Sequence, residues 1–189
     1  MRIISGTYKG KSILSPSEGT RPSTDRTRQA LFSLLQHIVP EARVLDLFAG
    51  SGVLGLECLS RGAVSATGVE LDRRSCQTIQ KNIRNLGVQS YTLLQRDVLA
   101  YLDSPVTDPV NLIFADPPYE DNFATSLLLQ VLAHSSWETR ATADAYFIAE
   151  SPQDLEKTGL IPDGWKIITT RSYGKCHITV LQRGGITPV

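Results

Sequence analysis

The feature that most constrains this chain is the stretch of residues 44–55, where a short apolar run leads into a glycine-rich turn and then into an apolar helical pattern. Gly50 and Gly52 lack a Cβ, so the turn can adopt backbone angles that other residues avoid and can let a ligand approach the main chain. The helix that follows presents unpaired N–H groups toward that ligand. The stretch therefore predicts a strand–turn–helix unit that binds a small molecule at its turn.

Two classes of cofactor fit this turn. Gly50, Gly52 and Gly55 match G-x-G-x-x-G, the spacing found in dinucleotide sites, which keeps a nicotinamide oxidoreductase open. Asp46 lies four residues before Gly50, where its carboxylate can pair with the ammonium group of a ligand. The Asp-Pro-Pro-Tyr sequence at residues 116–119 has no place in a nicotinamide enzyme. The combination favours S-adenosylmethionine.

Composition and charge indicate a globular domain with a basic arm. The 189 residues include 41% hydrophobic residues, enough for one domain of ordinary size with a core. The formal net charge is zero, but residues 1–28 hold six Lys or Arg against two acids, whereas the remaining residues hold 13 against 17. Such asymmetry predicts a basic β-hairpin appendage over residues 1–24 and a main domain over residues 25–189.

The cysteines and the N-terminus bear on the compartment. The three cysteines are widely spaced without a C-x-x-C pair, which favours reduced thiols over a disulfide framework or a zinc site. No signal peptide is recognisable, and no apolar run approaches the roughly 18 residues of a membrane span. We expect a cytoplasmic protein with no membrane partner.

The histidines and tryptophans lie outside the motifs. His37, His134 and His177 stand apart without metal-ligand spacing, so we expect them to be hydrogen-bonded or exposed and expect no metal site. Trp137 and Trp165 are predicted to be packing residues.

Periodicity predicts an α/β fold. After strand candidates at 2–5 and 11–14, a helix from about residue 25 carries an apolar face. Strands then alternate with helices, and a hairpin ends the chain. The predicted strands are 43–48, 66–70, 91–95, 110–115, 145–149, 166–173 and 176–183, and the predicted helices are 53–60, 73–86, 98–102, 123–133 and 153–158. This order indicates a mostly parallel seven-stranded sheet with helices on both faces and an antiparallel C-terminal hairpin.

One acidic residue follows or ends each of four successive strands, at the edge where such sheets bind ligands. Asp46 can pair with an ammonium group, Glu70 can accept both ribose hydroxyls, and Asp97 can accept from an adenine amine. Asp116 ends the fourth strand. Each acid taken alone could simply cap a helix, but the set favours a ligand site.

Residues 116–119 carry the chemistry in this interpretation. Pro117 and Pro118 fix φ and remove two N–H donors, while the Asp116 carboxylate and nearby carbonyls accept hydrogen bonds. Tyr119 offers a flat face for stacking a base. An exocyclic amine held there is oriented toward a sulfonium methyl, so positioning supplies most of the catalysis and no metal is expected. The alternative is a rigid proline turn in which Asp116 caps the next helix.

The N-terminal cations are predicted to contact phosphates. They are interleaved with Tyr8 and belong to the hairpin and to the start of the first helix, an arrangement that suits a nucleic-acid backbone. For any single arginine, a solvated surface position is the alternative. The predicted set is Arg2, Lys9, Lys11, Arg21, Arg26 and Arg28.

Several motifs together resemble a known family. They are Arg2-Ile3-Ile4-Ser5-Gly6, Arg21-Pro22-Ser23-Thr24-Asp25-Arg26, Ala30-Leu31-Phe32, residues 45–52, Leu59-Ser60-Arg61-Gly62-Ala63 and residues 116–119. The chain resembles the RsmD-type bacterial 16S ribosomal RNA guanine-N2 methyltransferases, which belong to the Rossmann-like class I S-adenosylmethionine-dependent methyltransferases. The likeness covers nearly the whole chain.

The resemblance implies methyl transfer to the N2 amine of a guanine in small-subunit ribosomal RNA, free or in a partly assembled 30S subunit. The guanine must leave its helix or loop to reach the site. The cofactor is implied to contact Asp46, Phe48, Ala49, Gly50, Ser51, Gly52, Glu70 and Asp97, and the guanine to contact Asp116, Pro117, Pro118 and Tyr119. The sequence is silent on oligomeric state, and a monomer is the expectation.

Two further hypotheses stay open beside the oxidoreductase. A DNA adenine-N6 methyltransferase would also fit residues 116–119, although only about 42 residues precede the first core strand and no separate DNA-recognition domain is evident. A non-catalytic RNA-binding protein that retains the fold would bind the cofactor without turnover.

Overall fold

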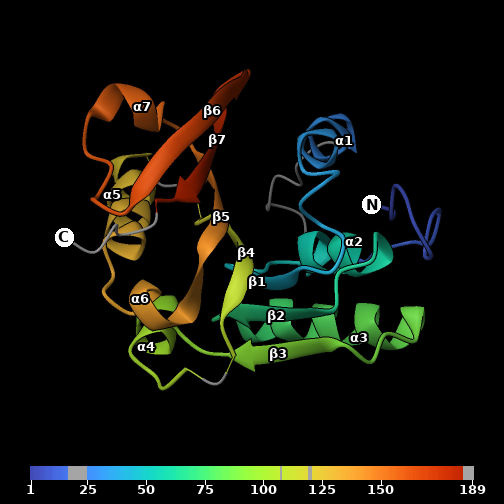
Figure 1. Cartoon of the computed structure of the whole chain (residues 1–189). Coiled ribbons are helices and arrows are strands. Elements are labelled where there is room, and N and C mark those ends of the chain that lie inside the picture. The colour runs from blue at the N-terminus through green and yellow to red at the C-terminus, as the bar shows by residue number, and fades with distance from the viewer. Residues whose placement is uncertain (17–24, 107, 119–120, 185–189) are drawn as a thin grey trace. The chain divides into compact units, whose positions relative to one another are not determined.

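The computed structural model describes residues 1–16, 25–106, 108–118 and 121–184. The chain divides into two compact units, Met1–Val98 and Leu99–Val189 (Figure 1). In chain order the elements are α1 (Asp25–Leu34), β1 (Arg43–Leu47), α2 (Val53–Ser60), β2 (Ser65–Glu70), α3 (Arg73–Leu86), β3 (Tyr91–Gln95), α4 (Val98–Leu102), β4 (Val110–Ala115), α5 (Asp121–Leu132), α6 (Trp137–Arg140), β5 (Ala141–Ser151), α7 (Leu155–Thr158), β6 (Trp165–Tyr173) and β7 (Cys176–Arg183).

The first unit contains three parallel strands in the order β3-β2-β1 (Figure 1). Right-handed connections between adjacent parallel strands place α2 and α3 on the same face of these strands. The bounds predicted for α3, residues 73–86, are confirmed. They could be predicted because both ends of the helix carry capping residues. Asp72 caps the start by accepting from the Ser75 N–H at 2.7 Å, and Gly87 ends the helix with φ 69°.

Residues 1–16 do not form the two strands predicted for them. Arg2 and Ser12 form a single antiparallel bridge, and the backbone between them turns toward α2. The Thr7 N–H donates to the Ser60 carbonyl at 2.8 Å, and the Tyr8 N–H donates to the Ser60 hydroxyl at 2.9 Å. The ends of the arm still pair with each other, since the Ile3 N–H donates to the Lys11 carbonyl and the Ile13 N–H to the Met1 carbonyl, but the backbone at Thr7 and Tyr8 bonds to α2 instead.

Buried Glu57 of α2 anchors the same segment. Its carboxylate accepts from the N–H groups of Ile4 and Ser5 at 2.8 and 3.0 Å and pairs with Arg61 at 2.8 Å. The Arg61 guanidinium also stacks over the Phe32 ring of α1, 4.6 Å from its centroid. A buried carboxylate satisfied in this way joins the arm and α1 to α2.

The fully buried Asn82 of α3 is a second anchor. Its amide nitrogen donates to the carbonyls of Leu14 and Ser51 at 3.0 and 2.9 Å, and its amide oxygen accepts from the Leu14 N–H at 2.8 Å. One side chain therefore fixes both the arm and the glycine-rich turn to α3.

The second unit contains four strands in the order β4-β5-β7-β6, with β4 and β5 parallel and the other pairs antiparallel. The predicted C-terminal hairpin is confirmed. β5 begins earlier than predicted because α6 precedes it directly, and this short helix was not predicted. Trp137, Phe147 and Trp165 meet edge to face with centroids 5.4 to 6.1 Å apart, which confirms both tryptophans as packing residues.

The α/β alternation predicted from periodicity is thus confirmed, with parallel strands first and an antiparallel pair last. The three cysteines, all within the described part of the chain, are free thiols. No helix among the residues that the structure describes is long and apolar enough to cross a membrane. The domain boundary predicted after residue 24 follows a segment outside the described residues and stays a prediction.

We expect Asn82→Ala to lower the free energy of unfolding by about 2 to 4 kcal/mol, because it leaves three backbone groups without their hydrogen bonds. Urea denaturation measures this loss. Asn85→Ala is the matched control, since Asn85 is exposed on the same helix and should cost less than about 1 kcal/mol. Equal losses in the two variants would show that Asn82 does not anchor the arm and the turn.

Candidate functional site

The glycine-rich turn after β1 has a left-handed backbone at three positions. Phe48, Gly50 and Gly52 have φ values of 62°, 56° and 74°. Phe48 stands out, because a bulky residue rarely adopts this conformation unless its surroundings enforce it. The Ala49 N–H donates to the Val69 carbonyl at 3.0 Å, which ties the turn to β2. The turn is therefore held in one shape by the neighbouring strand.

Gly50 and Gly52 differ in the space beside their backbones. A Cβ built on Gly50 would meet only the Phe48 carbonyl oxygen, at 3.9 Å, so the space beside its backbone is open. A Cβ on Gly52 would lie 3.1 Å from Ile79 and 3.2 Å from the Tyr91 hydroxyl. Gly50 is therefore the position where a ligand can approach the main chain, whereas Gly52 is required by internal packing.

Glu70, at the end of β2, joins two loops of this unit. Its carboxylate accepts from the Gly50 N–H at 2.7 Å and from the Asp72 N–H at 2.8 Å. The side chain is half-buried, so it keeps lone pairs available to a ligand at the edge of the strands. The prediction placed Glu70 near the ligand but did not foresee its bond to the turn.

Asp46 lies beneath the same turn with only 2% of its surface exposed. Its carboxylate accepts from the Gly55 N–H at 3.3 Å. Burial raises the pKa of Asp46 to about 7, the Gly55 hydrogen bond opposes this shift, and the charge of Glu70 adds to it. A cation bound beside Asp46 would favour its ionised form.

Tyr91 packs against the glycine-rich turn and is not among the predicted site residues. Its ring reaches from β3 across the strand glycine Gly68, and a Cβ there would lie 2.3 Å from the hydroxyl oxygen. A Cβ on Gly55 would lie 2.7 Å from the ring. The hydroxyl is buried without a hydrogen-bond partner in the described structure. The available signal was Gly68 itself, because glycine inside a strand often marks close approach of another group.

The remaining predicted residues of this unit differ in exposure. Ser51 is buried, and its carbonyl accepts from Asn82. Asp97 is exposed just after β3. Because β1, β2 and β3 are parallel, their carboxyl ends lie along one edge, and this edge brings together the turn, Glu70 and Asp97. Their cofactor contacts remain predictions.

The predicted base-binding segment belongs to the second unit. Directly after β4, Asp116 is half-buried, Pro117 is buried and Pro118 is exposed. Tyr119 lies outside the described residues. The roles predicted for these four residues remain predictions.

The predicted phosphate contacts are placed unequally. Arg2, Lys9, Lys11 and Arg26 are exposed, and Arg21 lies outside the described residues. Arg28 is fully buried, donates to the Arg2 carbonyl at 3.0 Å and pairs with Asp25. Its side chain therefore serves the packing of the arm against α1, and the phosphate contact predicted for Arg28 is wrong because the guanidinium is buried.

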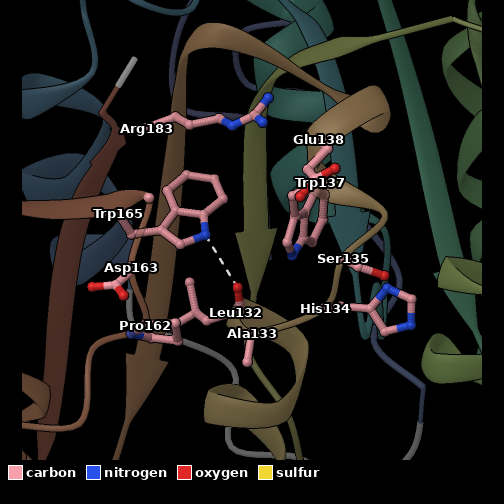
Figure 2. A pocket seen from close by; sticks show the side chains of 11 residues that line it. Leu132, Ala133, His134, Ser135, Trp137, Glu138, Pro162, Asp163, Trp165 and Arg183 are labelled. Carbon is pink, nitrogen blue, oxygen red and sulfur yellow. Dashed lines mark hydrogen bonds between the residues drawn. The ribbon is translucent and has the colours of Figure 1, made fainter. Parts of the chain in front are cut away.

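The described residues that line a pocket of about 130 Å³ in the second unit include none of the predicted site residues (Figure 2). The Trp165 indole N–H donates to the Leu132 carbonyl beside it at 3.1 Å. His134 on its rim contacts the Ser136 hydroxyl at 2.9 Å and Asp103 at 3.2 Å, as expected for a hydrogen-bonded histidine. Trp137 and Trp165 of the aromatic cluster line this pocket together with charged and polar side chains, among them Glu138, Asp163 and Arg183.

Comparison with known proteins gives one consistent picture. A family model described as Conserved hypothetical protein 95 matches residues 1–182. Ribosomal RNA small subunit methyltransferase D of Escherichia coli strain K12 is 33% identical over 184 residues, covering 97% of this chain and 90% of that protein. The protein of the same name from Haemophilus influenzae strain Rd is 32% identical over 178 residues, covering 92% and 89%. A solved structure, "Putative methyltransferase yhhF from Escherichia coli", superposes with a TM-score of 0.82 at 33% identity and covers 98% of both chains.

The packing of Tyr91 predicts a specific double-mutant cycle. Gly68→Ala should lower the free energy of unfolding by about 1 to 3 kcal/mol, because its Cβ meets the Tyr91 hydroxyl. In a Tyr91→Phe background the same change should cost about half as much or less. Gly184→Ala is the control, since a Cβ there meets nothing nearer than 4.0 Å. Strict additivity of the two changes in urea denaturation would contradict the proposed clash.

The pKa of Asp46 predicts how stability depends on pH. Because the folded pKa, about 7, exceeds the ordinary value of 3.8, folding takes up a proton between these values, and the ligand-free protein loses stability as pH rises through this range. Asp46→Asn removes this penalty. Its stability advantage over the wild type should therefore grow by on the order of 2 kcal/mol between about pH 5 and about pH 8.

Urea denaturation of the ligand-free proteins at the two pH values measures this difference. Asp108→Asn is the control, because Asp108 is exposed and its replacement should shift stability little and equally at both pH values. If the difference in unfolding free energy between Asp46→Asn and the wild type were the same at both pH values, the raised pKa of Asp46 would be contradicted.

Proposed function

This chain belongs to the family described as Conserved hypothetical protein 95, and we propose that it transfers a methyl group from S-adenosylmethionine to the exocyclic N2 amine of a guanine in 16S ribosomal RNA. The fold is that of the Rossmann-like class I methyltransferases. The observation that carries the proposal is identity of 33% along 97% of the chain to a protein named Ribosomal RNA small subunit methyltransferase D. The polar residues at the carboxyl edge of β1, β2 and β3 support the choice of S-adenosylmethionine as the methyl donor.

The first unit fits S-adenosylmethionine. The open space beside Gly50 admits a ligand to the backbone, and the half-buried Glu70 lies 2.7 Å from that N–H with lone pairs to spare for ribose hydroxyls. Asp46 supplies a carboxylate that favours a cationic neighbour such as the ligand's ammonium group. Asp97 is exposed at the next strand end and can accept from an adenine amine. When bound, the cofactor supplies an electrophilic methyl group on a sulfonium centre.

The second unit supplies the guanine contacts. Asp116 and the carbonyls of Pro117 and Pro118 are hydrogen-bond acceptors, which match the two N–H hydrogens of an exocyclic amine. They would orient the N2 amine for attack on the methyl group that the cofactor supplies. An N–C bond would replace the methyl–sulfur bond of the cofactor, and Asp116 or solvent would accept the amine proton. Because this amine is a weak nucleophile, orientation is the main contribution of Asp116.

The RNA backbone is assigned to the exposed cations of the arm. Arg2, Lys9 and Lys11 belong to a segment that Glu57, Ser60 and Asn82 fix to α2 and α3, and Arg26 is exposed on α1. Rigid anchoring lets these charges hold the RNA in one register while the target base enters the site. We propose ribosomal RNA, free or in a partly assembled 30S subunit, as the partner of a monomeric enzyme.

Transfer of a tritiated methyl group to small-subunit RNA that lacks native methylation tests this function. The RNA is offered free and in assembled subunits, and the product is digested to nucleosides. Label in N2-methylguanosine is the expected result, and the better substrate identifies the stage of assembly. Label in N6-methyladenosine, or on DNA alone, would overturn the substrate. Cofactor binding without label on any nucleic acid would favour a non-catalytic protein.

Asp116→Ala should reduce methyl transfer at least about a hundredfold while leaving the affinity for S-adenosylmethionine within about twofold. The reason is that Asp116 positions the amine and not the cofactor. Calorimetry and single-turnover assays measure the two quantities. Asp108→Ala is the control, as an exposed acid from the same unit. Parallel loss of cofactor affinity in Asp116→Ala would contradict this role.

A further inference from the structure

We propose that the outer face of α3 is a second RNA-binding surface that contacts phosphates, in addition to the N-terminal arm. This inference rests on the proposed function. The face is formed by four exposed cations, Arg73, Arg74, Lys81 and Arg84. None of them belongs to the motifs of the sequence analysis.

The four cations lie on one side of the helix. α3 is anchored by the buried residues Ser75, Cys76, Ile79 and Asn82. At 100° per residue, the cations fall within an arc of about 100° opposite Ile79. Arg73 and Arg84 are eleven positions apart and so span about 16 Å of the axis at 1.5 Å per residue. The result is a cationic stripe long enough to follow several phosphates of one strand.

Acidic residues are absent from this helix. Its 14 residues, RRSCQTIQKNIRNL, hold four cations and no Asp or Glu, whereas the chain after residue 28 has more acids than cations. A helix face stabilised by its own charges usually alternates their signs at i, i+4 spacing. Within the described residues, none of the four cations forms an ion pair at 4.0 Å or less. The cap residue Asp72 lies next to Arg74 and is the nearby counter-charge.

The position of two cations disfavours an ordinary stabilising role. Arg73 and Arg74 occupy the first turn of α3, where the positive end of the helix dipole disfavours cations. The helix therefore tolerates an electrostatic cost at this end. Phosphate groups bound along the face would reverse that cost, because they neutralise the cations and interact favourably with the N-terminal turn.

The face is also rigidly connected to the arm. Asn82 of α3 holds Leu14 through two hydrogen bonds and holds the Ser51 carbonyl through a third. The arm, the cofactor turn and α3 are therefore parts of one packed unit. RNA bound along α3 would be held in a fixed position relative to the turn, which is what a site-specific enzyme requires.

The test compares two triple variants with equal loss of charge. One carries Arg73→Gln, Lys81→Gln and Arg84→Gln, which keep helix propensity. The control carries Lys166→Gln, Arg171→Gln and Lys175→Gln, at exposed positions of the β6–β7 hairpin. Filter binding measures the affinity for an unmodified 16S ribosomal RNA transcript between about 50 and about 300 mM KCl. Thermal unfolding and calorimetry with S-adenosylmethionine establish that each variant is folded and binds the cofactor.

The α3 variant should bind the RNA about tenfold to a hundredfold more weakly near 50 mM salt, and its slope of log affinity against log salt should fall by about 2 to 3, close to 1 per lost phosphate contact. Cofactor affinity should not change. An α3 variant that binds like the wild type, or a control that loses as much, would overturn the inference. A wild type that binds S-adenosylmethionine but no RNA would instead contradict the proposed function.

Discussion

The packing of the Tyr91 ring against three glycines is the constraint on which the first unit depends. Gly68 leaves the space on β2 that the ring crosses, and Gly55 and Gly52 leave the space above it. This contact sets how closely α2 approaches the strands, and therefore where the turn and Asp46 lie. The third glycine of G-x-G-x-x-G serves helix–strand packing here, as it does in dinucleotide-binding proteins. The same spacing is therefore compatible with either cofactor class, because it meets one packing requirement.

Buried polar side chains extend this arrangement to the N-terminal arm. Glu57, Ser60 and Asn82 form hydrogen bonds with backbone groups of residues 4–14. The arm is therefore held by α2 and α3, the helices that also contact the glycine-rich turn. Such groups are costly to bury unless they are satisfied, and removing one partner leaves the other unpaired. The basic arm is therefore a structural part of the unit that contains the glycine-rich turn. If the arm binds RNA as proposed, this packing would couple the placement of the RNA to that of the turn.

The sequence allowed local elements to be predicted well and long-range contacts poorly. α3 was predicted with correct bounds because Asp72 and Gly87 mark its ends with side-chain and backbone signals. The strands of residues 1–16 were not confirmed, because this segment pairs with itself only in part: the N–H groups of Ser5 and Tyr8 bond to α2 side chains 52 residues away. Asp46, Glu70 and the turn were predicted from periodicity and spacing. Tyr91, which no motif marks, could be recognised only once the strands were aligned, since its partners come from β2 and α2.

Charge distribution shows how a chain of zero net charge could serve the proposed RNA-modifying function. Asp46 is buried within β1, Glu70 ends β2 and Asp97 follows β3, while exposed cations occupy the arm and α3. Electrostatic attraction in salt is short-ranged, falling off over about 8 to 10 Å, so local clusters matter more than the total. A uniformly basic protein would bind any nucleic acid. Under the proposed function, cations confined to rigid segments would let phosphates fix the register of the RNA, while the acids would lie where a cationic cofactor binds.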